Sequence, residues 1–146
     1  ACARTDRMKA AHLLDTSAVL AHLLQEKGSD TVEHCISPEG GRAAISIVSW
    51  VEFQLFLTRS DYPQADTAKI LGFYREALGS PLPIDESVGK AAIALRAQTP
   101  TRIHLTDLLI AACAKEHGLK LVYRDKHIKG IPAKVLPQIK LPQKTP

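Results

Sequence analysis

Five short apolar runs divide the chain, and their pattern restricts the fold more than any other feature of the sequence. They lie near residues 11–15, 43–48, 82–84, 119–123 and 133–136. Most of them are continuous rather than alternating, which predicts strands that are buried on both faces. Strands of this kind are typical of a parallel sheet that is covered by helices on both sides.

The residues between these runs place apolar side chains at helical spacing. Helices are expected near residues 17–25, 49–59, 87–98 and 106–118, with four helices in all over residues 17–78 and with Gly118 ending the last helix. Strand and helix therefore alternate along the chain. This alternation predicts an α/β fold, a three-layer α/β/α sandwich with a central parallel sheet of about five strands.

The size and composition of the chain fit one domain. With 146 residues, 45% of them hydrophobic, the chain can bury one proper core but not two ordinary ones. We expect the domain to span residues 8–136, with residues 1–7 a disordered extension or cloning remnant and residues 137–146 a C-terminal tail.

The cysteines and the first apolar stretch bear on where the protein works. The three cysteines are odd in number and form no C-x-x-C pair, which argues against a disulfide framework or a zinc site and favours a reducing cytoplasm. Because Asp15 and two histidines interrupt the first apolar stretch, it is neither a signal peptide nor a membrane span. The net charge of +4 permits a polyanionic partner without demonstrating one.

Four acidic residues stand where the predicted fold would bring them together. Asp15 and Asp125 follow the first and fourth runs, Glu52 lies one turn into the helix after the second run, and Asp107 follows Thr106, a plausible N-cap, in the first turn of the last helix. Each has a plain structural explanation by itself, as a turn residue, a solvated helix position or a residue favoured by the helix dipole. Together at one sheet edge, however, four like charges need a cation.

Oxygen ligands without His or Cys select Mg²⁺ or Mn²⁺, so the acids predict a divalent metal site. Arg124 and Lys126 flank Asp125 and either meet phosphates there or form a solvated turn. His104 is a weak candidate ligand, because no paired histidine spacing accompanies it. Without a G-x-S-x-G elbow, Ser17 is expected to donate a hydrogen bond to Asp15 rather than to act as a nucleophile. The absence of a Gly-rich phosphate loop excludes P-loop and dinucleotide-binding folds.

Several of these segments resemble one family. "LLDTSAVL", the Glu in "SIVSWVEF", "LTDLLIAACAKEHGLKLVYRD" and the order of the four acids are similar to the PIN domain, particularly to the stand-alone VapC-type toxins of bacteria. The resemblance runs from Met8 to about Leu136. It implies a divalent-metal-dependent endoribonuclease that a cognate antitoxin holds inactive.

The resemblance also implies roles for individual residues. Asp15, Glu52, Asp107 and Asp125 match the four acids of the family, and Ser17 matches the small polar residue that supports the first of them. One position departs from the pattern: the family usually has Thr or Ser two residues before the last acid, where this chain has Tyr123. The hydroxyl of a tyrosine lies much farther from the backbone, so weak activity or an altered substrate is expected.

The chemistry expected of this site is hydrolysis of RNA phosphodiester bonds. Asp15 and Asp107 would bind one or two metal ions, Asp125 would complete the shell, Thr106 would support the helix that carries Asp107, and Glu52 would orient the attacking water or take its proton. The alternative is a PIN scaffold that binds RNA or a protein but cuts weakly or not at all. A receiver-like phosphoacceptor is a weaker third reading, since its acids and lysine have no clear counterpart.

Partners are expected as well. Residues 17–78 hold more large apolar side chains than one sheet face can cover, so some of them fill the core and the surplus is expected to bury itself against a second copy or an antitoxin helix. We therefore expect a homodimer when the protein is alone and a tight complex with its antitoxin. The apolar side chains are Leu23, Leu24, Trp50, Phe53, Phe56, Leu57, Phe73 and Tyr74.

Overall fold

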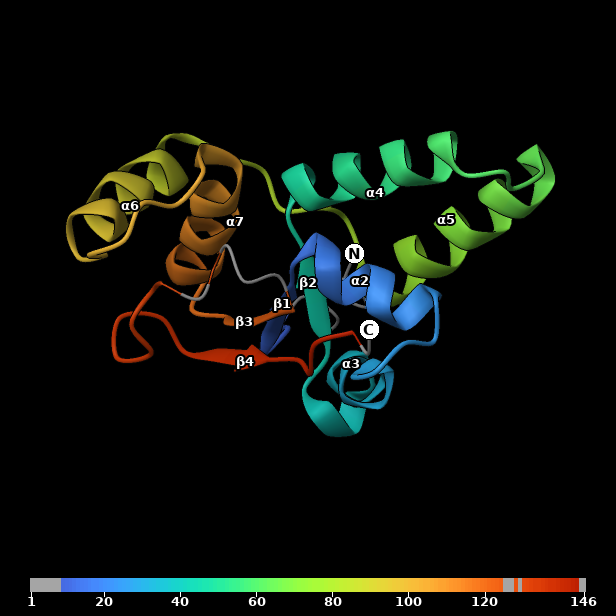
Figure 1. Ribbon diagram of the computed structural model, residues 1–146, viewed down its shortest axis with the longest axis horizontal. Helices are drawn as coiled ribbons and strands as arrows, with labels where there is room; N and C mark the ends of the chain where they lie inside the picture. Colours follow the sequence, from blue (N-terminus) through green and yellow to red (C-terminus); the bar gives the residue numbers. More distant parts are fainter. Residues whose placement is uncertain (1–8, 125–127, 129, 145–146) are drawn as a thin grey trace.

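A four-stranded parallel sheet forms the centre of the molecule (Figure 1). The computed structural model describes residues 9–124, 128 and 130–144. The strands lie side by side in the order β2-β1-β3-β4, and every neighbouring pair is parallel. Their bounds are β1 His12–Leu14, β2 Ala43–Ile45, β3 Lys120–Tyr123 and β4 Gln138–Lys140.

Helices cover both faces of this sheet. Four helices and one 3-10 turn lie between β1 and α6, and Figure 1 shows α6 and α7 gathered on the side opposite α2, α4 and α5. The four helices expected over residues 17–78 are all present. The helical bounds are α2 Thr16–Leu23, α3 Ser29–Ile36, the 3-10 turn Pro38–Gly40, α4 Ile47–Arg59, α5 Gln64–Leu78, α6 Glu86–Ala97 and α7 Leu105–Glu116.

Two apolar cores, one on each face of the sheet, hold the layers together. Leu13 of β1 packs with buried residues of α6 and α7, whereas its neighbour Leu14 packs with residues of α2, α3, α4 and α5. Leu121 and Val122 of β3 divide between the same two cores. Because consecutive side chains of a strand point to opposite faces, a continuous apolar run supplies both cores at once. The predicted three-layer α/β/α sandwich is confirmed.

The strand boundaries differ from the prediction at two places. The run at residues 82–84 contributes one isolated bridge, between Ser46 and Leu82, rather than a strand. The run at residues 133–136 is not a strand, because the backbone amides of Val135 and Leu136 both donate to the carbonyl of Pro132 and so close a turn. The fourth strand of the sheet is β4, in the segment predicted to be a tail.

The connection from α7 to β3 is fixed by the predicted stop at Gly118. This glycine has a φ of +65°, in the left-handed region that residues with a side chain adopt only at a cost. Its amide donates to the carbonyl of Lys115, and the amide of Leu119 donates to the carbonyl of Ala114. These paired bonds close the last helical turn and direct the chain into β3. Within the described part of the chain, no helix is long and apolar enough to cross a membrane.

Candidate functional site

Three of the predicted acids lie at the carboxyl edge of the sheet. Asp15 directly follows β1 and caps α2, Glu52 lies in the second turn of α4 after β2, and Asp107 lies in the first turn of α7. The carboxylates of Asp107 and Glu52 both act electrostatically on Asp15. The structure therefore places these three predicted residues at the same edge, near enough for Asp107 and Glu52 to act on Asp15. Asp125, the fourth acid, lies outside the described residues, as does Lys126.

Asp15 is held in place from two sides. Its backbone amide donates to the carbonyl of Val122 over 2.9 Å, which continues the pairing of β1 with β3. Its carboxylate oxygen Oδ2 accepts from the Ser17 hydroxyl at 2.6 Å and from the Ser17 amide at 3.2 Å. The Ser17 hydroxyl in turn accepts from the backbone amide of Arg124 at 2.9 Å. Ser17 thus connects the first acid to the residue that precedes Asp125.

Among the residues that the structure describes, no positive charge compensates the buried Asp15 carboxyl. Its residue is only 3% exposed, and burial is the main reason that its pKa rises to about 6. The two hydrogen bonds from Ser17 act in the opposite direction, while the negative charges of Asp107 and Glu52 raise the pKa further. In the part of the chain that the structure describes, no cation contributes to this shift. A bound cation would offset both the cost of burying the Asp15 charge and its repulsion by Asp107 and Glu52.

Glu52 is oriented by a residue to which the sequence analysis gave no role. The Thr16 hydroxyl donates to Glu52 Oε1 at 2.5 Å, so the first residue of α2 fixes one carboxylate oxygen of a residue on α4. This bond leaves the second oxygen for another donor. The position of Thr16 directly after Asp15 was the available signal, but nothing in the sequence pairs it with Glu52, which lies 36 residues away.

The helix that carries Asp107 begins earlier than predicted. Its N-cap residue is His104 rather than Thr106, because the helix runs from Leu105 and the amide of Leu108 already donates to the His104 carbonyl. The His104 side chain makes no capping bond. Thr106 is an exposed residue of the first turn, so its predicted capping role is wrong.

Arg124 points along α2 instead of out into solvent. Only 10% of its side chain is exposed, and its Nη2 lies 2.8 Å from Glu26 Oε1. Burial would raise the pKa of Glu26, but Lys144 and Arg124 outweigh this effect and lower it. Contact between Arg124 and RNA phosphates stays a prediction, and this buried ion pair weighs against it. No pattern in the sequence marks Glu26, which stands in a polar loop.

Tyr123 has a structural role away from the acids. Its hydroxyl donates to Gln138 Oε1 of β4 at 2.9 Å, and Gln138 Nε2 donates to the carbonyls of Ile131 and Leu136. The ring faces the core under α7, together with Leu121. Tyr123 therefore stabilises the edge strand β4. Near the acids, the hydroxyl bonded to the end of β3 is that of Ser17, which accepts from the Arg124 amide.

The residues present fit a hard divalent cation by their chemistry. The donors are carboxylate and hydroxyl oxygens, which are the groups preferred by Mg²⁺ and Mn²⁺. Among residues 9–124, 128 and 130–144, no three His, Cys, Asp or Glu side chains converge as a complete metal-binding group. The repulsion on buried Asp15 is the observation that favours a cation, and Asp125 is the acid that would add to the set.

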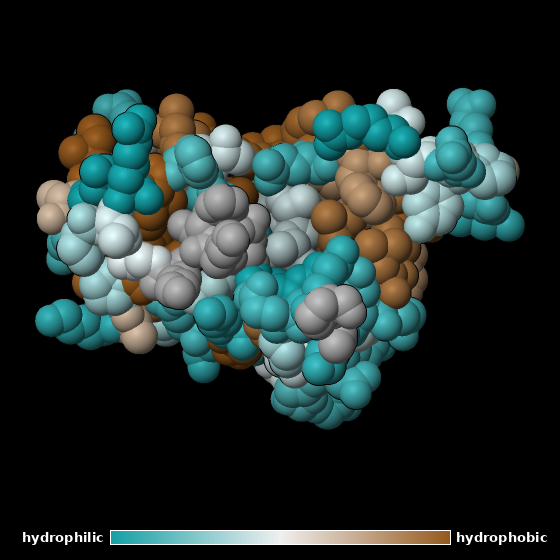
Figure 2. Space-filling model, viewed as in Figure 1, coloured by the Kyte–Doolittle hydropathy of each residue, from teal (hydrophilic) through white to brown (hydrophobic). Residues whose placement is uncertain are grey.

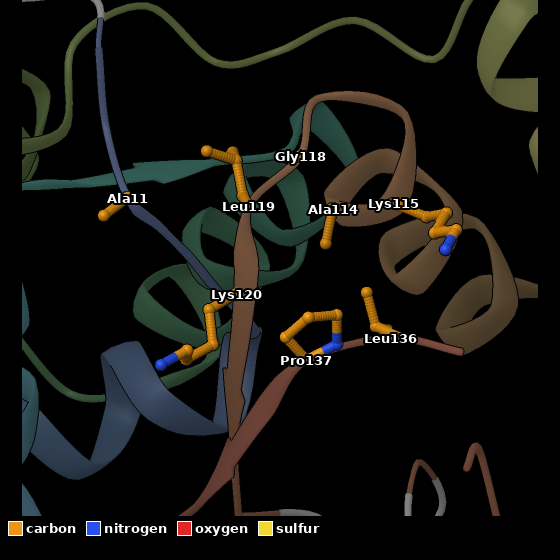
Figure 3. A pocket seen from close by; sticks show the side chains of 8 residues that line it. All are labelled: Ala11, Ala114, Lys115, Gly118, Leu119, Lys120, Leu136 and Pro137. Atoms are coloured by element: carbon orange, nitrogen blue, oxygen red, sulfur yellow. The ribbon is translucent and has the colours of Figure 1, made fainter. Parts of the chain in front are cut away.

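A separate pocket lies at the opposite edge of the sheet. It has a volume of about 290 Å³ and opens among the amino ends of the strands, where Ala11 precedes β1, Lys120 begins β3 and Pro137 precedes β4 (Figure 3). Lys115 also lines it, but its ammonium group donates to the Val135 carbonyl at 2.6 Å. None of the described residues in its walls is acidic, so this pocket is separate from the acid site.

A comparison with protein families assigns the fold. The model of the PIN domain matches residues 12–134, which include β1, the acid site and β3. The chain belongs to the PIN domain family. No curated protein matches the chain in sequence. The family resemblance predicted from the acids and the segments around them is confirmed.

Solved structures share this PIN fold over nearly their whole length. VapBC2 from Rickettsia felis, bound to a promoter DNA fragment, matches with a TM-score of 0.71 and 20% identity over 90% of this chain and 98% of that one. VapBC-5 from Mycobacterium tuberculosis matches with a TM-score of 0.65 and 22% identity, again over 90% and 98%. DNA-bound VapBC from Salmonella typhimurium matches with a TM-score of 0.69 and 18% identity, over 88% of this chain and 96% of that one.

Proposed function

We propose that this PIN domain is a Mg²⁺- or Mn²⁺-dependent endoribonuclease and the toxin of a VapBC-like toxin-antitoxin pair. The observation that carries the proposal is the buried Asp15 carboxylate, next to two further acids at the carboxyl edge of the sheet. A folded protein gains no stability from such an arrangement, so a charged ligand is the simplest reason for it. The similarity in fold to VapBC structures supports the toxin assignment.

Each residue would have a distinct task in RNA hydrolysis. Asp15 and Asp107 would hold the metal, and Asp125 would complete its shell. A bound divalent metal supplies a more acidic water and neutralises charge on the phosphoryl oxygens. Glu52, fixed through one oxygen by Thr16, would use its other oxygen to orient the attacking water or to accept its proton. Ser17 would keep Asp15 from turning out of the site.

The proposal is tested by removing one ligand charge at a time. We expect Asp15→Asn and Asp107→Asn to lower Mn²⁺-dependent cleavage of total RNA by more than about 100-fold, since even outer-shell partners of a metal contribute roughly 10- to 100-fold. Both variants should keep the fold, because Asn has nearly the volume of Asp. Growth inhibition on expression is the second measurement.

Asp66→Asn is the matched control for Asp107→Asn. Asp66 is an exposed acid in the first turn of α5, as Asp107 is in the first turn of α7. Cleavage by the Asp66→Asn variant should equal that of the wild type. Full cleavage and toxicity in Asp15→Asn would contradict the proposed function.

The alternative function is a PIN scaffold that binds RNA or a protein partner without efficient cleavage. It is favoured by Tyr123, which stands where the family usually has Thr or Ser and whose hydroxyl donates to Gln138 of β4. A titration with Mn²⁺ followed by a cleavage assay on total RNA separates the two functions. Metal binding without cleavage of any RNA would favour the scaffold.

We further propose that the apolar surface of α4 and α5 meets protein partners. Ile47, Val51 and Leu55 are 38%, 45% and 52% exposed and lie four residues apart, on one stripe of α4. Phe73 of α5 is 54% exposed, and Figure 2 shows hydrophobic residues gathered where these helices lie. An antitoxin segment on this surface would bring a basic side chain towards Asp15 and Asp107, while a second copy would cover it in the free toxin.

A further inference from the structure

Arg124 and Glu26 form an ion pair along α2, here called the brace, and the first acid of the site is connected to it. Arg124 has two contacts with this part of the chain: its backbone amide donates to Ser17 at the start of α2, and its guanidinium pairs with Glu26 beyond the end of α2. One residue thus touches both ends of a single helix. Asp15, the N-cap of that helix, lies next to the first contact.

The residues after β4 contact both members of the brace, Arg124 and Glu26. The Gln143 side chain donates to the carbonyl of Arg124 at 2.9 Å, and Lys144 lies 3.0 Å from the second oxygen of Glu26. The backbone amide of Leu141 donates to the carbonyl of Tyr123 at 2.7 Å. Both carbonyls at the end of β3 are therefore held by this segment, which the sequence analysis assigned to a C-terminal tail.

Close packing fixes the loop that carries Glu26. Gly28 has a φ of +93°, and a Cβ atom at this position would lie 3.1 Å from Leu141 Cβ. The segment after β4 therefore rests directly on the loop between α2 and α3. Only 23% of the Glu26 side chain is exposed, and Arg124 Nη1 and Glu26 Oε1 are both buried without a well-aligned hydrogen bond among the described residues, so charge rather than hydrogen-bond geometry holds the pair. This makes Glu26 the counter-charge on which the buried guanidinium depends.

We infer that the Glu26–Arg124 ion pair, closed by Gln143 and Lys144, is a positioning device for the metal site and not only a structural contact. The pair holds the backbone amide of Arg124 against Ser17, whose hydroxyl accepts from this amide and donates to Asp15. It holds the peptide that leads into Asp125 at the same time. Outer-shell groups of this kind set the orientation of metal ligands. The inference rests on the proposed metal-dependent function.

The test measures Mn²⁺ affinity by calorimetry on the whole chain, with Glu26→Gln as the first variant. We expect Mn²⁺ binding to weaken by about 10-fold or more, and kcat for RNA cleavage to fall by about 10- to 100-fold with little change in KM. Exchange of the Arg124 backbone amide with solvent should speed up at the same time. Glu26→Asp, which keeps the charge, should recover part of each effect.

Two further variants separate positioning from general stability. Gln143→Ala removes the bond to the Arg124 carbonyl while leaving the ion pair, so it should change Mn²⁺ affinity in the same direction by a smaller factor. Glu86→Gln removes a carboxylate from an exposed pair with Lys90 on α6 and should change none of the readouts. A lower melting temperature in Glu26→Gln, with Mn²⁺ affinity and Arg124 exchange unchanged, would overturn the inference.

The outcomes distinguish this inference from the proposed function. Wild type that binds Mn²⁺ but cuts no RNA would remove the nuclease proposal, and the affinity of Glu26→Gln would still decide the role of the brace. Wild type that cuts RNA, together with a Glu26→Gln variant equal to it in Mn²⁺ affinity, kcat and amide exchange, would remove the brace alone. If the wild type binds no Mn²⁺, both are overturned.

Discussion

Asp15 combines two properties that oppose each other in a folded protein. Its carboxyl is almost completely buried, and two other carboxylates act on it. A carboxyl whose pKa is raised by folding stabilises the folded state at low pH, and this contribution is lost as the pH rises. The metal-free protein therefore loses stability at neutral pH through the residue on which its proposed activity depends.

The first residue-scale prediction concerns this penalty. The contribution of Asp15 to stability is fully present below its unfolded pKa of 3.8 and is lost as the pH rises through about 6. The difference corresponds to a free energy on the order of 3 kcal/mol. Without metal, Asp15→Asn should therefore be more stable than the wild type at pH 7.5 and should lose this advantage near pH 4. Melting temperatures measured in EDTA across this range check it.

Divalent metal provides the control for that prediction. Added Mg²⁺ or Mn²⁺ should raise the melting temperature of the wild type at pH 7.5 and leave Asp15→Asn nearly unchanged, because the variant lacks the ligand charge. A stability difference between the two proteins that does not vary with pH would contradict the burial argument.

At single positions, the sequence predicted the acids better than their supporting contacts. Asp15, Glu52 and Asp107 could be predicted because each occupies a fixed place relative to a strand or a helix start. The partners of Arg124 could not, since Glu26 and Gln143 lie in segments without a pattern of their own. Tyr123 was an informative departure, but only the structure shows that its hydroxyl serves β4.

At the scale of elements, the end of α7 determines where β3 begins. Gly118→Ala should destabilise the protein by about 1 kcal/mol, because the left-handed φ of +65° is costly for alanine even though its Cβ would meet nothing within 4 Å. Gly72→Ala is the same chemical change inside α5, also in open space, and should stabilise by about 1 kcal/mol. Chemical denaturation measures both. Equal effects of the two substitutions would contradict this account.

Strands could be predicted where an apolar run is buried, and the prediction failed where prolines bound the run. β1, β2 and β3 all lie within predicted runs, because each supplies both cores. The run at residues 133–136 has the composition of a strand, but Pro132 and Pro137 bound it and a turn results. β4 has a mixed sequence, and its place is determined by pairing with β3 rather than by its own composition.

For the whole molecule, the sequence correctly predicted exposed apolar side chains in residues 17–78, but only some of the residues that it named are exposed. Phe53, Leu57 and Tyr74 belong to the core, whereas Phe73 is exposed. The α4 stripe was not predicted, because Ile47, Val51 and Leu55 were absent from the expected surface set. Which face of a helix meets the sheet depends on how the helix is docked, and that cannot be read from spacing alone.

The corresponding prediction concerns assembly. The wild type should sediment as a homodimer, and Leu55→Glu should shift it to a monomer by placing a charge in the apolar stripe. Ile93→Glu is the control: Ile93 is 75% exposed on α6, away from that stripe, and its substitution should leave the dimer intact. A wild type that is monomeric at high micromolar concentration would show the prediction to be wrong.

The hydrogen bond between Ser17 and Arg124 joins residues that are 107 positions apart. Contacts of such long sequence separation are slow to form, because the loop that they close must first lose its conformational entropy. Neither β1 nor α2 alone can assemble the acid site, so a partly folded chain carries the acids without the geometry that would make them a nuclease. Under the proposed function, RNA cleavage should therefore appear only after the kinetic phase of refolding that brings these two segments together.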